Sequence, residues 1–387
     1  MGVPKLRFKA DDGSDFPDWT FRTFGSVVEE FNDRTTTENE GVLLSCAIDG
    51  MYLNSELFGH QRGASNIGYK KITKGALILS VQNLHLGNAN VNTRFEHGIV
   101  SPAYKTFHIV GCLTEFMSAW VKRHAARKFF YDATTVGASQ CRRNVDWEEL
   151  YQQTIAVPSP SEQRKIADLL SAVDDVISAQ EAEVAAWEKR KKGVMQKLFS
   201  QEVRFKADDG SDFPDWEEKT LGDICMYERQ RSEGANFVGT ENMLKDFGGV
   251  TFDNSNADGS GTLYHPGDTL MSNIRPYLKK AWLADRKGTC STDVLVFHPT
   301  SVEPGYLYWL IASDAFVRYV MSAVKGLKMP RGDKKHIMEM PLLLPNKDEQ
   351  RKIDDCLSSL NNVIIKAKNE LAKWQELKKG LLQQMFV

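Results

Sequence analysis

The sequence predicts an α+β fold in which two mixed α/β modules are joined by two long helices that form an antiparallel coiled coil, with a pseudo-twofold internal repeat. Three observations lead to this prediction. Residues 162–199 return without a gap, 187 positions later, as residues 349–386. Residues 7–19 recur unchanged as residues 204–216. The regions between these repeats, 20–158 and 217–345, have similar lengths of 139 and 129 residues.

The repeated segment, RFKADDGSDFPDW, is expected to form a compact turn between a helix end and the next module. Asp-Asp-Gly-Ser and Phe-Pro-Asp-Trp are typical turn sequences. A calcium loop is a poorer interpretation, because the carboxylates lack EF-hand spacing. The identity of the two copies indicates recent duplication or recombination and has no further physical explanation at the level of sequence.

The two modules share an order of elements but little residue-level similarity. Strands are predicted at 77–81 and 269–272, and again at 104–110 and 294–298. One helix follows in each module, at 113–131 and 306–324. A polar or basic loop and a short strand, 154–158 or 342–345, then close each module. The backbone plan is therefore shared, while the surface residues differ.

Each long repeat predicts one amphipathic helix with a heptad seam. The seam residues are spaced alternately by four and three: Ile166, Leu170, Val173, Ile177, Gln180, Val184 and Trp187, then Ile353, Leu357, Leu360, Ile364, Ala367, Leu371 and Trp374. Ser161 and the run 346–348 are the expected N-caps. Each apolar seam needs a partner. A folded-back chain buries both seams, and we prefer that arrangement to a homodimeric coiled coil, which remains the alternative.

These landmarks divide the chain into six parts. They are an N-terminal repeat segment (1–19), a first module (20–158), a central long helix (159–203), a repeated connector (204–216), a second module (217–345) and a C-terminal long helix (346–387).

Composition limits the possible classes of protein. The chain has 387 residues, 42% of them hydrophobic, and a net charge of −2. Apolar runs fall short of the roughly 20 residues that a membrane span needs, and no secretory signal is evident, so we expect a cytoplasmic protein. Six scattered cysteines suggest buried thiols rather than a metal site. Although the total charge is nearly neutral, Lys and Arg cluster locally at 122–143, 275–287 and 325–335.

The chain is not expected to be an enzyme. It has no phosphate-binding loop, dinucleotide fingerprint, zinc-protease motif or nucleophile elbow, and no Asn-Pro-Pro-Tyr run typical of adenine methyltransferases. No cofactor or metal is therefore expected on this chain.

The candidate DNA-binding residues lie in basic segments that also carry amides and aromatic rings. Arg, Gln and Asn are the side chains that read guanine and adenine edges in the major groove, whereas Lys contacts phosphates. The candidates are Gln140, Arg142, Arg143 and Asn144 in the first module, and Arg275, Tyr277, Lys279, Lys280, Lys328, Arg331, Lys334 and Lys335 in the second. For any single residue, a solvated surface loop remains the alternative.

The order of variable module, EQRKI…W…KKG helix, second variable module and second such helix closely resembles the specificity subunit of type I restriction-modification systems. The resemblance covers essentially the whole chain, and its specific feature is the double occurrence of these blocks at one offset. It implies that the modules are target-recognition domains for a bipartite site in double-stranded DNA, held apart by an antiparallel coiled coil. The identity of residues 7–19 and 204–216 exceeds the similarity usual in that family.

The resemblance also implies partners. Two methyltransferase (modification) subunits are expected to dock on the chain, and restriction motor and nuclease subunits to join them. S-adenosylmethionine, ATP and Mg²⁺ would belong to those partners, and methylation would fall on adenine N6. A function of another class stays open: a structural coiled-coil adaptor whose α/β modules bind proteins rather than DNA.

Overall fold

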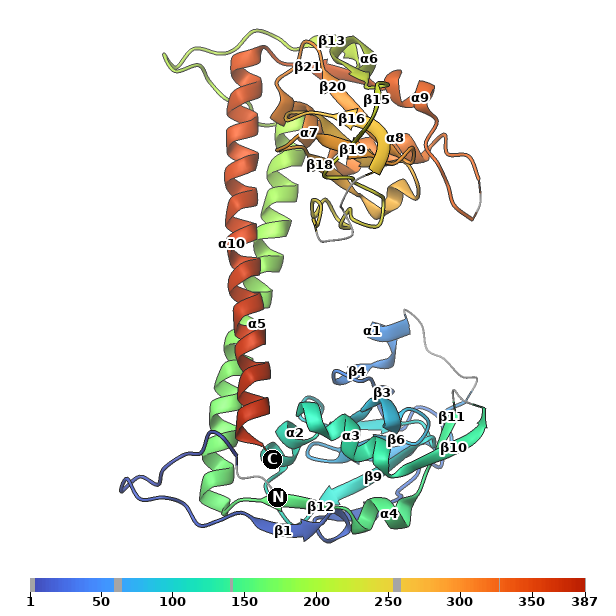
Figure 1. Cartoon of the computed structure of the whole chain (residues 1–387), viewed down its shortest axis with the longest axis vertical. Coiled ribbons are helices and arrows are strands. Elements are labelled where there is room, and N and C mark those ends of the chain that lie inside the picture. The colour runs from blue at the N-terminus through green and yellow to red at the C-terminus, as the bar shows by residue number, and fades with distance from the viewer. Residues whose placement is uncertain (1–3, 59–64, 140–141, 253–258, 327, 387) are drawn as a thin grey trace. The chain divides into compact units, whose positions relative to one another are not determined.

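Figure 1 shows the computed structural model, which describes residues 4–58, 65–139, 142–252, 259–326 and 328–386. The chain divides into two compact units. The first comprises Met1–Ala182 and Lys368–Val387, and the second comprises Glu183–Ala367. Within the described ranges, no helix is both long and apolar enough to cross a membrane.

The first unit is built on a four-stranded antiparallel sheet with the strand order β2-β9-β6-β7. Its strands are β2 (Val28–Phe31), β9 (Tyr104–Ile109), β6 (Leu77–Ser80) and β7 (Ala89–Val91). Four antiparallel pairs accompany it: β1 (Thr20–Thr23) with β12 (Thr154–Val157), β3 (Leu44–Cys46) with β4 (Met51–Leu53), β5 (Lys70–Thr73) with β8 (His97–Val100), and β10 (Thr134–Ser139) with β11 (Arg142–Val145). The short helices are α1 (Asn54–Phe58), α2 (Thr114–Trp120), α3 (His124–Asp132) and α4 (Trp147–Gln152).

The second unit repeats this plan, with a four-stranded antiparallel sheet in the order β14-β20-β17-β18. Its strands are β14 (Cys225–Tyr227), β20 (Val294–Pro299), β17 (Thr269–Ser272) and β18 (Ala281–Leu283). A second sheet contains β15 (Arg231–Gly234), β16 (Gly259–Tyr264) and β19 (Gly288–Cys290), and β13 (Glu217–Thr220) pairs with β21 (Pro341–Leu344). The short helices are α6 (Leu221–Ile224), α7 (Pro304–Ile311), α8 (Asp314–Met321) and α9 (Lys334–Met338).

The strands predicted in corresponding places of the two modules do correspond. β6 and β17 each lie inside their sheet and pair with the following long strand, β9 or β20. The closing strands β12 and β21 each pair with the first strand of their own module. The predicted mixed α/β character is therefore confirmed.

The predicted helices at 113–131 and 306–324 are each interrupted, so this prediction is wrong in detail. In the first unit, Arg123 is extended (φ −62°, ψ 151°) between α2 and α3, and its guanidinium lies 4.1 Å from the centre of the Trp120 ring. In the second unit, the Ser313 hydroxyl accepts a hydrogen bond from the Phe316 backbone N–H and caps α8. The extended backbone at Arg123 thus interrupts the first helical pattern, and the new N-cap at Ser313 interrupts the second.

The two long helices are α5 (Pro160–Phe199) and α10 (Lys347–Met385), and none of their predicted seam residues is exposed. Within the first unit, Asp174 pairs with Lys378 at 2.5 Å, and Glu181 accepts from Gln375 at 3.5 Å. As residue numbers increase along α5, those of their partners on α10 decrease, so these parts of the two helices run antiparallel. Within the second unit, Lys191 Nζ donates to Asn361 Oδ1 at 2.9 Å.

Each core contains residues from both long helices. In the first unit, Ile166 of α5 and Met385 of α10 belong to the same cluster as Phe24 and Trp120. In the second, Leu198 and Leu357 pack in the cluster that surrounds the fully buried Tyr306. Burial of apolar surface therefore ties each module to the helix pair.

The N-cap prediction is correct for α10 and wrong for α5. Asn346 Oδ1 accepts a hydrogen bond from the Glu349 N–H at 2.9 Å. Ser161 lies inside α5, and Ser159 Oγ accepts from the Glu162 N–H at 3.4 Å instead. Pro160 suits the first helical position because its missing N–H is not needed there, and the cap therefore lies two residues earlier than the sequence suggested.

Both repeated segments form the predicted compact turn and are anchored to the start of a long helix. In the first copy, Asp12 accepts from the backbone and the hydroxyl of Ser14, and Gly13 adopts a positive φ of 84°. Arg7 then donates to both carboxylate oxygens of Glu162, at 3.0 and 2.8 Å, and Trp19 Nε1 donates to the same group at 3.1 Å. Both ends of the segment are therefore hydrogen-bonded to the first turn of α5.

Candidate nucleic-acid interface

The predicted DNA-binding residues of the second module lie in two segments, 272–280 and 325–335, that contact each other. Ile274 forms an antiparallel bridge with Arg331, and the Arg275 N–H donates to the Pro330 carbonyl at 2.8 Å. A second bridge, between Lys325 and Arg331, closes the later segment on itself. Segments about 55 residues apart in sequence thus form one surface, which we call the paired-loop surface.

Arg275 occupies an unusual backbone conformation on this surface. Its φ of 51° and ψ of 62° lie in the left-handed region, directly before the short turn Pro276–Leu278. Lys279, after that turn, has a φ of 54°. Left-handed residues other than glycine cost on the order of 1 to 2 kcal/mol each, and such strain gathers at functional sites. The turn presents Arg275 and Tyr277 to solvent, the latter 48% exposed.

The two lysines after Tyr277 are engaged within the second unit. Lys279 Nζ pairs with Asp314 at 2.8 Å. Lys280 Nζ donates to the Thr240 carbonyl at 2.6 Å, and its pKa is lowered because burial disfavours the charged form. The structure therefore gives both lysines a role in holding the loop, whereas Arg275 and Tyr277 face outward.

The later segment contributes cations from its turn and from α9. Lys328 is exposed, and Arg331 pairs with Asp293 at 3.2 Å. The Asp333 carboxylate caps α9 by accepting from the backbone N–H groups of Lys335 and His336. The same carboxylate pairs with Lys325, and these partners lower its pKa to about 2, the Lys325 hydrogen bond being the largest cause. Asp333 thereby fixes the first turn of α9, which carries Lys334 and Lys335.

In the first unit, the predicted basic segment is a strand rather than a loop over Arg142, Arg143 and Asn144, which belong to β11. β10 and β11 pair antiparallel, with Thr135 opposite Asn144. Arg143 donates to the Thr134 hydroxyl at 2.6 Å and to its carbonyl at 2.5 Å, and its guanidinium lies 4.1 Å from the centre of the Tyr131 ring. Asn144 is exposed. Gln140 and the side chain of Arg142 lie outside the part of the chain that the structure describes.

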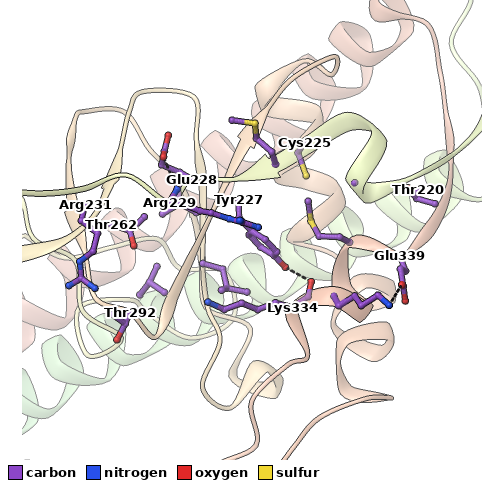
Figure 2. Close-up of a pocket in the computed structure, with 17 residues that line it drawn as sticks. Thr220, Cys225, Tyr227, Glu228, Arg229, Arg231, Thr262, Thr292, Lys334 and Glu339 are labelled. Carbon is purple, nitrogen blue, oxygen red and sulfur yellow. Dashed lines mark hydrogen bonds and ion pairs between the residues drawn. The ribbon is translucent and has the colours of Figure 1, made fainter.

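Two further cations were missed by the sequence analysis. Arg229 and Arg231 line a cavity of about 1130 Å³ together with Lys334 and Lys335 (Figure 2). The run Glu-Arg-Gln-Arg at 228–231 contains the same side-chain types as the predicted segment of the first module. It was overlooked because it stands between two short strands rather than before the closing strand.

Three of the six cysteines are buried as predicted, Cys112 and Cys356 are only partly buried, and Cys141 lies outside the described residues. Cys46, Cys225 and Cys290 are buried, and burial raises the pKa of Cys46 to about 11 and of the other two to about 12. Such thiols are poor nucleophiles and poor metal ligands. Across the described residues, no group of three or more His, Cys, Asp or Glu side chains is placed to hold a metal ion.

The order of modules and long helices along the chain is that of a known class of fold. It is similar to the crystal structure of the type I restriction-modification system S subunit from M. genitalium, with a TM-score of 0.58 and 15% identity, over 100% of this chain and 99% of that one. This likeness establishes the fold class.

Sequence comparisons show which family the chain resembles. Residues 214–374 match the family model described as type I restriction modification DNA specificity domain. The MjaVIII specificity subunit of Methanocaldococcus jannaschii is 22% identical over 269 residues, 60% of this chain and 62% of that protein. The EcoDI specificity subunit of Escherichia coli is 24% identical over 127 residues, 32% of this chain and 28% of that protein. The chain thus matches less than two thirds of either relative, and the predicted resemblance to type I specificity subunits is confirmed.

Proposed function

We propose that this chain is a non-catalytic DNA-recognition subunit of a type I restriction-modification complex, and that its two modules read the two halves of a bipartite target. The observation that carries the proposal is the paired-loop surface, where the strained turn at Arg275 presents a guanidinium and a phenol and the neighbouring segment exposes Lys328. Guanidinium groups bind guanine O6 and N7 with two hydrogen bonds, so this turn has the chemistry of a base reader.

The long helices would act as the spacer between the two readers. In this proposal α5 and α10 form an antiparallel coiled coil that relates two repeats by a pseudo-twofold axis. At about 1.5 Å per residue, the 40 residues of α5 span roughly 60 Å. If both modules approach one face of a duplex, the centres of the two half-sites should lie about one turn of DNA, roughly 34 Å, apart or somewhat further.

Joining two weak readers gives useful specificity. A module that contacts about 3 to 5 base pairs discriminates by a few kcal/mol, and a second module in fixed register multiplies that selectivity. The near-neutral net charge of −2 suits a reader whose partners supply much of the phosphate contact.

Chemistry would be supplied by partner subunits. We propose that two methyltransferase (modification) subunits dock on the chain and that restriction motor and nuclease subunits join them. S-adenosylmethionine, ATP and Mg²⁺ would then be bound by those partners, with adenine N6 as the methylated atom. The chain itself would position the DNA.

The test is DNA binding by the complex reconstituted with its methyltransferase subunits. The target sequence is first obtained by mapping methylated adenines in cells that express the complex. Duplexes with both half-sites are then titrated at a series of spacings. Tight binding at one spacing supports the proposal, whereas equal affinity at every spacing contradicts the role of the helices. DNA affinity that is absent or independent of salt would instead favour the protein-binding adaptor.

A further inference from the structure

The cavity that contains the two missed arginines lies between the sheet and α9 of the second unit (Figure 2). Its floor includes Val294, Leu295 and Val296 of β20, and its walls come from β14 and the segment leading into β15 on one side and from α9 on the other. The Tyr227 hydroxyl donates to the Lys334 carbonyl at 3.1 Å, which ties the two walls together. The cavity is therefore bounded by hydrogen-bonded elements.

Positive charge dominates this cavity. Arg229 and Arg231 come from one wall and Lys334 and Lys335 from the other. The carboxylates are already engaged, because Glu228 accepts from the backbone N–H groups of Arg229 and Gln230 at 2.7 Å and Glu339 pairs with Lys335 at 3.6 Å. Within the described ranges, the Arg229, Arg231 and Lys334 side chains form no ion pair with the protein. Three cations on two walls are thus available to an anionic ligand.

Two segments of the chain run from the cavity lining to the paired-loop surface. Thr292 lines the cavity, and the next residue, Asp293, pairs with Arg331 on that surface. Lys334 and Lys335 line the cavity and follow Arg331 by only a few residues in the same segment. Asp293 and Arg331 thus connect the cavity lining with the turn that carries Arg275, all within the second unit.

We propose that this cavity receives the sugar-phosphate backbone of the DNA strand that runs beyond the bases met by the paired-loop surface. The inference rests on the proposed function and assigns Arg229, Arg231 and Lys334 to phosphate oxygens. A guanidinium matches two phosphate oxygens in one plane, and an ammonium adds a point charge. These contacts carry no base information, so they set affinity and register while Arg275 reads sequence.

The experiment measures DNA affinity of the reconstituted complex against salt for the double variant Arg229→Gln with Arg231→Gln. Each lost phosphate contact lowers the slope of log affinity against log salt by about 0.9, so two contacts lower it by about 1.8. Over a fourfold rise in salt, the wild-type affinity should then fall about tenfold further than that of the variant. The loss should be equal for target and non-target duplexes, and the ranking of target sequences should not change.

A matched control is available on the same unit. Arg286 and Lys287 are exposed but lie outside the cavity lining, so Arg286→Gln with Lys287→Gln should leave the slope unchanged. Lys334→Gln, on the opposite wall, should lower the slope by about 0.9. Arg229 and Arg231 are exposed, so the double variant should keep the wild-type circular dichroism spectrum.

The outcomes separate this inference from the proposed function. An unchanged slope in both cavity variants, while Arg275→Ala still alters base preference, overturns the cavity assignment alone. A loss confined to one base position also overturns it, because the arginines would then read bases. A wild-type complex with no salt-dependent DNA affinity overturns the proposed function and this inference together.

Discussion

Arg204 holds the carboxylate of Glu349 with two hydrogen bonds, from Nε to Oε1 at 3.1 Å and from Nη2 to Oε2 at 2.8 Å. Trp216 Nε1 adds a third at 2.9 Å, and the Glu349 side chain is only 1% exposed. Arg7, Glu162 and Trp19 form the same cluster in the first unit. The first and last side chains of the repeated segment therefore have a structural role: the arginine neutralises a glutamate buried at the start of each long helix, and the tryptophan donates a hydrogen bond to it.

Arg204→Ala should destabilise the second unit by about 3 to 5 kcal/mol, because it leaves the Glu349 carboxylate buried without its cation. Glu349→Gln should cost less, about 1 to 3 kcal/mol, since the arginine is 24% exposed and can turn to water. Denaturant unfolding measures both values. Asp215→Ala is the control, because this fully exposed carboxylate lies 3.9 Å from Arg204 and should contribute little. An equal effect of all three variants would contradict the cluster's role.

The sequence alone predicted those features of the fold that depend on local periodicity, above all the apolar seams of the two long helices. The seams were correct because a spacing of three and four residues places side chains such as Ile166 and Leu170 on one face of any helix. The Arg7–Glu162 contact was not predictable, because it joins residues 155 apart and each partner looks like an ordinary surface charge. For the same reason, the sequence did not show that Lys279 pairs with Asp314 or that Lys280 donates to the Thr240 carbonyl, and their contact with phosphates stays a prediction.

Ile364→Asp should destabilise the helix pair by at least about 3 kcal/mol. Ile364 is 3% exposed in the seam of α10, so the change removes apolar contacts and buries a carboxylate. Its neighbour Ile365 is 47% exposed, and Ile365→Asp should change stability by less than about 0.5 kcal/mol. Unfolding followed by circular dichroism at the helix band compares the two. Similar losses in both variants would show that the seam is not where the helices pack.

Acid should weaken the second unit through Asp314. Hydrogen bonds from Lys192 and Lys279 lower the pKa of this carboxyl to about 2. A lowered folded-state pKa gives stability that is present above the ordinary pKa near 4 and is lost as pH falls toward 2. Asp314→Asn should therefore flatten the stability profile over that interval by on the order of 1 to 2 kcal/mol. Asp355→Asn, an exposed site on α10, should leave the profile unchanged, and a parallel shift of both variants would refute the assignment.

Arg143→Ala should loosen the β10–β11 hairpin. The guanidinium bonds to Thr134 and lies over the Tyr131 ring, so its loss frees the base of the hairpin. Amide hydrogen exchange in β10 should accelerate by about tenfold or more, as expected for losing a contact of about 1.5 kcal/mol. Asn144→Ala, at the exposed next position, should leave exchange unchanged. If exchange is unaltered in Arg143→Ala, Arg143 is not needed to hold the hairpin, and the result would favour a direct contact of its side chain with DNA.

Arg275→Ala should change which sequences are bound rather than how strongly all DNA is bound. Its guanidinium is exposed on a turn whose left-handed backbone and bond to Pro330 fix its direction, so truncation removes a base contact without disturbing the core. We expect the variant to lose about 1 to 3 kcal/mol of binding free energy on the target duplex. On duplexes that are altered at the base contacted by Arg275, the variant and the wild-type protein should bind with similar affinity. Titrating a set of duplexes with single substitutions in the half-site measures this. Lys328→Ala, on the same surface, is the comparison, because losing a phosphate contact weakens all duplexes equally. If Arg275→Ala behaves like Lys328→Ala, its guanidinium contacts the backbone and the bases must be read from another part of the second module.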